Sequence, residues 1–200
     1  MPAHRKSKIS LGAIGLLFAA APALGALSGT ATISSAPSGA NYNYTIVLTN
    51  PSASGTNIGT FWFAWTPPGQ PVEYDFLPSN PTPTGQPAGW AGLSSLGNPG
   101  YSIQYYNVSG SLIAPGQTGT FQFTSADSPT VLQGLSFGIF PNTESFIYAA
   151  PPATPGGLPA GSSARVDPVF VPEPSALALV AAGCIGALCR RRRDAGAAAA

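Results

Sequence analysis

The chain is poor in the side chains that carry most enzyme chemistry, and the few it has lie near its ends. It has two cysteines and one histidine in 200 residues. His4 precedes the first apolar run, Cys184 and Cys189 lie in the last one, and no lysine follows Lys8. Residues 26–168 therefore cannot form a Ser-His-Asp or Cys-His arrangement, a zinc site of the usual ligands or a Schiff-base lysine. We expect no catalysis, no cofactor and no metal site.

Charge is scarce as well, at 8% of all residues, and the cations are gathered at the two ends. Arg165 is the only lysine or arginine between the first eight residues and the arginine run that begins at position 190. The stretch between them carries five acidic residues: Glu73, Asp75, Asp127, Glu144 and Asp167. A nucleic-acid-binding protein needs clustered cations to neutralise phosphates. The weakly acidic middle of the chain therefore excludes nucleic acid as a partner.

The first 25 residues have the pattern of a secretory signal peptide. A basic start is followed by the apolar run Ile9–Phe18, and Pro22 interrupts that run. Small residues then precede the junction between Gly25 and Ala26, as in a signal-peptidase site. We expect export and cleavage before Ala26. A retained membrane anchor is the alternative, but the apolar run is short for one.

The C-terminal end has three parts in order. It consists of the tripeptide Pro172, Glu173 and Pro174, the uncharged segment Ser175–Cys189, and the cluster Arg190, Arg191, Arg192 and Arg193. Fifteen helical residues span about 22 Å at 1.5 Å each, short of the roughly 30 Å hydrocarbon core. Arginines at this end predict a cytoplasmic C-terminus. The sequence thus indicates a short membrane helix that tethers an exported precursor.

These three parts, at residues 170–193, resemble the PEP-CTERM sorting signal, a module also called the ice-binding protein C-terminal domain. That second label is not a reason to expect ice binding. The resemblance implies recognition and cleavage by exosortase, a membrane processing enzyme. It also implies delivery to the cell surface or extracellular polysaccharide of a Gram-negative-type bacterium. The alanine-rich tail 194–200 departs from the family pattern, because the arginines are then not terminal. A plain single-pass anchor is the alternative.

Between the two ends, apolar and polar residues alternate with a period of two, which predicts half-buried strands. Such runs occur at Tyr42–Leu48, Phe61–Trp65, Tyr101–Tyr105, Phe121–Phe123 and Leu135–Ile139, and turn-forming Pro, Gly and Asn residues separate them. We predict an antiparallel β-sandwich of seven to nine strands over residues 26–150. Leu112–Phe123 resembles a turn-and-strand pattern of bacterial immunoglobulin-like domains, so the sandwich is expected to be immunoglobulin-like.

Two segments rich in proline and glycine are not predicted to be strands. Residues 78–100 contain Trp90 and are expected to form a long loop, and such loops are often functional. Residues 151–169 are expected to be a semi-extended linker that separates the sandwich from the sorting segment.

Two sets of residues are candidates for binding. Glu73 and Asp75 lie two apart on an expected strand and share a face. Their simplest role is on a solvated strand face, with a calcium site or a glycosidase pair as alternatives. Aromatic rings can stack on sugars, and we expect Trp62 or its neighbour Trp65 to be exposed, because alternation places them on opposite faces. Trp90, in the expected loop, is the tryptophan least expected in the core.

The sequence thus predicts a non-catalytic protein that serves a structural role at the surface or in the extracellular matrix. The alternative is a carbohydrate-binding module for exopolysaccharide, with Trp90 and Trp62 stacking on the glycan.

Overall fold

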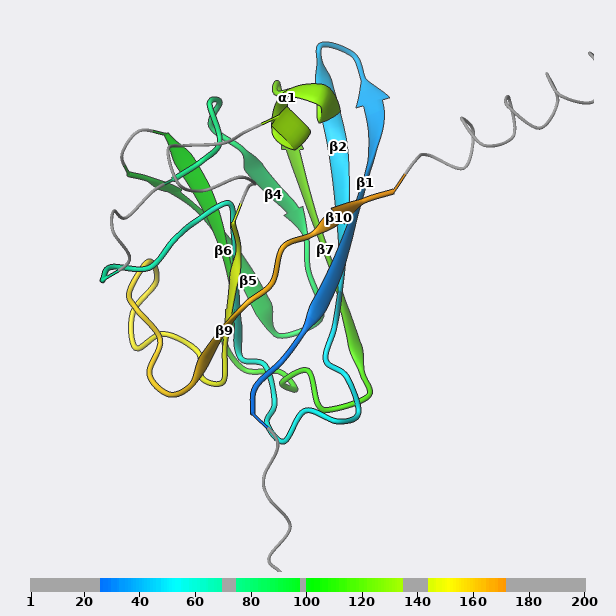
Figure 1. Ribbon diagram of the computed structural model, residues 1–200. Helices are drawn as coiled ribbons and strands as arrows, with labels where there is room; N and C mark the ends of the chain where they lie inside the picture. The colour runs from blue at the N-terminus through cyan, green and yellow to red at the C-terminus, as the bar shows by residue number, and fades with distance from the viewer. Residues whose placement is uncertain (1–25, 70–74, 98–99, 135–143, 172–200) are drawn as a thin grey trace, which may run out of the picture.

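The computed structural model describes residues 26–69, 75–97, 100–134 and 144–171. These residues form two five-stranded sheets that lie face to face (Figure 1). Within the described ranges, no helix is long and apolar enough to cross a membrane. The predicted signal peptide, membrane helix and arginine cluster lie outside these ranges, as does the predicted strand at Leu135–Ile139.

The first sheet has the strand order β10-β1-β2-β7-β4. Its longest strands are antiparallel neighbours, whereas β10 runs parallel to β1 at the sheet edge. Gly39 turns the chain between β1 and β2 with a φ of 63°, a conformation that glycine adopts at little cost. The five strands are β1 (Thr30–Ser38), β2 (Asn41–Thr49), β4 (Thr82–Gly85), β7 (Thr118–Ser125) and β10 (Val169–Phe170).

The second sheet has the order β5-β6-β3-β8-β9, and all of its pairs are antiparallel. Its strands are β3 (Thr60–Phe63), β5 (Trp90–Leu96), β6 (Tyr101–Asn107), β8 (Phe146–Tyr148) and β9 (Ser163–Arg165). A short helix, α1 (Pro129–Gly134), follows β7. Ser128 caps it, since its Oγ accepts a hydrogen bond from the Val131 N–H at 3.3 Å.

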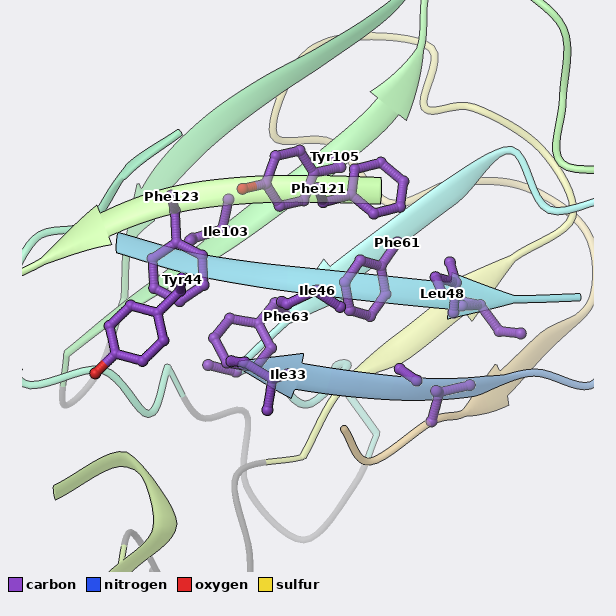
Figure 2. Close-up of a cluster of buried hydrophobic side chains, with 14 of the residues drawn as sticks. Ile33, Tyr44, Ile46, Leu48, Phe61, Phe63, Ile103, Tyr105, Phe121 and Phe123 are labelled. Carbon is purple, nitrogen blue, oxygen red and sulfur yellow. The ribbon is translucent and has the colours of Figure 1, made fainter. Parts of the chain in front are cut away.

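The main core fills the space between the sheets with the apolar side chains predicted by alternation. Figure 2 shows aromatic rings from both sheets meeting there. The rings of Tyr44 and Phe123 stack with centroids 4.7 Å apart, and those of Tyr105 and Phe121 lie at the same separation. Each fully buried side chain of this size stabilises the fold by about 1.5–3 kcal/mol. The strands predicted around Tyr44, Phe61, Tyr105 and Phe121 are therefore confirmed.

The expected long loop at residues 78–100 is wrong, because this segment supplies both β4 and β5. Its prolines are compatible with β4 because that strand is at the edge of its sheet, where an unpaired backbone nitrogen is tolerated. Pro83 pairs with Phe123, and a bulge then separates it from Gly85.

The linker expected at residues 151–169 also differs from the structure. Ser163–Arg165 forms β9 against β8, and Val169 pairs with Thr32 in the first sheet. The folded domain therefore extends beyond residue 150 and includes both edge strands.

Candidate functional site

The segment that leads into the sorting region is built into the sandwich. We call residues 162–171 the strap. It begins where the Ala149 N–H donates to the Ser162 carbonyl at 3.0 Å, and it continues through β9 at the edge of the second sheet. It then crosses to β10 at the edge of the first sheet (orange in Figure 1). The strap thus joins the two sheets along one open side of the sandwich.

The centre of the strap is held by a buried side chain. Val166 is in the main core, and its N–H donates to the Ser145 carbonyl at 2.8 Å. Gly29 makes room for it, because a Cβ at that position would lie 3.1 Å from Val166 Cγ2 and 2.9 Å from Ile147 Cδ1. Further along the strap, the partly buried Phe170 also packs on the core. These contacts explain why a proline-rich segment does not stay a free linker.

An ion-pair cluster holds the same part of the strap. Arg165 Nη1 lies 2.6 Å from Glu144 Oε1, and its Nη2 lies 2.7 Å from Asp167 Oδ2. The Glu144 side chain is only 4% exposed, and burial raises the pKa of its carboxyl while Arg165 opposes that increase. The hydrogen bonds to Asp167 raise the pKa of Arg165. The one cation of the middle of the chain therefore neutralises the buried acid beside the strap.

The strap ends directly at the predicted sorting tripeptide. The Val171 N–H donates to the Ile33 carbonyl at 2.9 Å, and Pro172 is the next residue in the chain. The tripeptide and the arginine cluster lie outside the described residues, as does the Gly25 side of the predicted signal cleavage site. Sequence reasoning missed the strap. Its weak signals were the alternation of Ala164 and Val166 and the isolated position of Arg165.

The two tryptophans of β3 and the turn after it are buried together, contrary to the prediction from alternation. Trp62 and Trp65 are 3% and 2% exposed, on the face of the second sheet that is opposite the main core. Trp62 pairs with Phe146, whereas the Trp65 N–H bonds to Glu144, only two residues further along the partner. Ala64 is the extra residue, with a φ of 58°, so the alternation is reset at a β-bulge. Neither indole presents a face to a sugar.

Trp90 is also buried, which corrects the prediction that it stacks on a glycan. It is 6% exposed, its ring meets Phe121 at 5.4 Å, and its Nε1–H donates to the Ser111 carbonyl at 3.0 Å. Trp90 lines a cleft of 710 Å³ whose lining has no charged side chain. The cleft is formed by residues 87–90, 109–114, 117 and 118.

The acidic residues that the structure describes serve the fold. Asp75 is buried beside Trp65, to which it is joined by a β-bridge, and Glu73 lies outside the described ranges. Asp127 accepts hydrogen bonds from the Ser79 N–H at 3.0 Å, from the Ser79 hydroxyl at 2.6 Å and from the Ser125 hydroxyl at 3.2 Å. Among the described residues, no three potential metal ligands lie together.

Comparison with known proteins identifies one feature. No curated protein matches the chain. A family model, described as the PEP-CTERM protein-sorting motif, matches residues 170–193. The match begins within the strap, so Phe170 and Val171 belong both to the fold and to the motif. The chain therefore carries a PEP-CTERM protein-sorting motif, which indicates an exported protein that exosortase directs to the cell surface.

Proposed function

We propose that the folded domain is a non-catalytic, immunoglobulin-like structural module of the cell surface or extracellular matrix. The observation that carries this proposal is the direct connection between the sandwich and the sorting motif. A motif that continues directly from a sheet edge delivers that sheet, so the sandwich itself is what the sorting step places at the surface.

The use of the polar groups in the described residues supports a structural role. Asp127 holds two serines, and Glu144 and Asp167 both pair with Arg165. A general acid or base must be able to reach a substrate proton. Buried carboxylates that are engaged in the fold's own contacts are poorly placed for that work.

The route to the surface is part of the proposal. A signal peptide is removed before Ala26, and the precursor is held by a short membrane helix with Arg190–Arg193 in the cytoplasm. Exosortase then cleaves within the sorting segment, and the sandwich is released or attached at the surface.

The test is the intact mass of the protein isolated from the surface of its native cells. The mature chain should begin at Ala26 and lack the arginine cluster. Any attached lipid or glycan adds a defined mass to the same spectrum. If most of the surface-exposed protein retained the arginines, the segment would be a simple anchor. Separately, turnover of any polysaccharide by the purified protein would contradict the structural role.

A further inference from the structure

The overlap between the strap and the sorting motif has a consequence for processing. The last backbone hydrogen bond of the strap involves Val171, the residue immediately before Pro172. The Phe170 side chain packs on the main core, one position earlier. The fold and the motif therefore have no spacer between them.

We propose that β10 must leave the edge of β1 before exosortase can process the motif, so the folded domain controls access to its own sorting signal. This inference rests on the proposed processing of the motif by exosortase. A cleaving enzyme has to enclose an extended chain on both sides of the bond that it breaks. A residue whose N–H is bonded to β1, next to a side chain that packs on the core, cannot be enclosed in that way.

The structure of β10 fits a segment that detaches while the rest of the domain stays folded. The strand has only two residues, lies at a sheet edge and is the one parallel partner of β1. Val169 is 64% exposed and Val171 is 41% exposed, so their release uncovers little apolar surface. Opening of such weakly packed edges is the cheapest local unfolding in a domain.

The earlier part of the strap is held much more firmly than β10. Val166 is buried in the core, and Arg165 pairs with both Glu144 and Asp167. The change in mobility therefore falls at the Asp167–Pro168 step, between a fixed segment and a releasable one. In this arrangement β9 remains on the sandwich while β10 and the motif move toward the enzyme.

A reversible cross-link tests the proposal in the full-length precursor. Thr32 and Val169 are direct partners across the parallel pair, and both are exposed. Thr32→Cys with Val169→Cys should form a disulfide in the oxidising space outside the cytoplasm, because paired strand residues have the required separation. The reference protein carries Cys184→Ala and Cys189→Ala, which removes the natural thiols. The matched controls are the two single cysteine variants in that background.

Processing is followed by intact mass after a pulse of synthesis in the native cells, and thiol alkylation reports the cross-linked fraction. We expect the oxidised double variant to remain as precursor, with processing slowed at least about tenfold, while both single variants match the reference. Addition of dithiothreitol should restore processing of the same molecules, which excludes misfolding as the cause.

Processing of the oxidised form at the reference rate would overturn this proposal and leave the sorting function intact. The proposal also fails if the two cysteines never cross-link, because β10 would then not lie on β1 in the precursor. If the reference protein itself were never processed, both this proposal and the proposed function would fail.

Discussion

The indole rings of Trp62 and Trp65 stack with centroids 3.8 Å apart and planes 9° from parallel. Phe146 meets Trp65 edge-on at 6.4 Å, and the Trp62 Nε1–H donates to the Ser102 hydroxyl at 2.9 Å. Beside Trp62, the cross-strand residue Gln104 bonds to the backbone of residues 156 and 157. The second sheet is therefore covered on both faces, by the main core and by this smaller aromatic cluster.

This cluster predicts a large loss of stability when the stack is broken. Trp65→Ala should lower the free energy of unfolding by about 3–5 kcal/mol, because it leaves a cavity against Trp62. Trp62→Phe keeps a ring in place but loses the hydrogen bond to Ser102, so it should cost about 1–2 kcal/mol. Urea denaturation measures both. Val47→Thr, at a partly exposed position on β2, is the control and should change stability by less than about 0.5 kcal/mol.

The burial of all three tryptophans predicts that iodide quenches the native fluorescence very little. The chain has three tryptophans, and none is more than 6% exposed. Unfolding in urea should restore quenching to the level of a free indole. For Trp90, replacement by alanine should destabilise the domain by about 3–5 kcal/mol rather than only removing a surface contact. Strong quenching of the native protein, or a Trp90→Ala variant as stable as wild type, would return Trp90 to the surface.

Much of the fold could be predicted because burial on one face of a strand imposes a period of two. The pattern at Tyr42–Leu48 indicated β2 directly, and Tyr44, Ile46 and Leu48 are all buried. Trp65 was misplaced because one residue, Ala64, adopts a left-handed conformation and resets the alternation. Alanine carries no signal for that conformation. A bulge of this kind is therefore set by tertiary packing and not by local sequence.

The sorting motif was predictable for a different reason, since its parts are contiguous in the chain and are read without knowledge of the fold. The strap was not, because its partners are remote in sequence. Arg165 pairs with Glu144 and β10 pairs with Thr32–Ile33, and neither relationship leaves a periodic pattern. Composition suggested a linker, whereas the buried Val166 decides the outcome.

The ion pair between Arg165 and Glu144 predicts a stability loss that depends on pH. Arg165→Gln leaves a buried carboxylate without its counter-ion. It should cost about 1–2 kcal/mol at pH 7, less than a fully buried pair would, because Arg165 is 42% exposed. Burial raises the pKa of Glu144 in the folded state, so its contribution to stability is present at low pH and is lost as pH rises through that pKa. Loss of Arg165 raises this pKa further.

The deficit of Arg165→Gln relative to wild type should therefore shrink as the pH falls and Glu144 becomes protonated in both proteins. Urea melts at a series of pH values between about 4 and 8 measure it, with the range chosen around the ordinary carboxyl titration. The matched control is Arg165→Gln combined with Glu144→Gln, which should recover most of the stability at pH 7. A deficit that stays constant with pH would mean that the charge of Glu144 plays no part.

The sorting segment predicts two different defects from two sets of substitutions. Replacement of Pro172 and Pro174 by alanine should block processing and leave membrane insertion intact, so the full-length precursor accumulates in the membrane. Replacement of Arg190–Arg193 by glutamine removes the charges that hold this end in the cytoplasm, so uncleaved precursor should change its location. Cell fractionation with intact-mass analysis separates the two results. Normal sorting of both variants would show that the segment is not a signal.

The strap predicts that the cooperative folding unit extends to residue 171. A fragment of residues 26–150 lacks β9 and β10, so the edges of β8 and β1 lose their partners. It also leaves the space that Val166 fills beside Gly29 empty and removes the counter-ion of Glu144. Loss of Val166 burial alone costs about 1.5–3 kcal/mol. Urea unfolding should therefore have a clearly lower midpoint for this fragment than for residues 26–171, which is the matched control.

Open strand edges also favour association, so the shorter fragment should form oligomers at concentrations where the longer one is monomeric. Size-exclusion chromatography with light scattering measures this directly. Both proteins lack cysteine, so dithiothreitol should not alter either melt. If the two fragments unfolded at the same urea concentration, the strap would lie on the sandwich without contributing to its stability. The domain would then end before Ser162, and the sorting motif would have a free spacer after all.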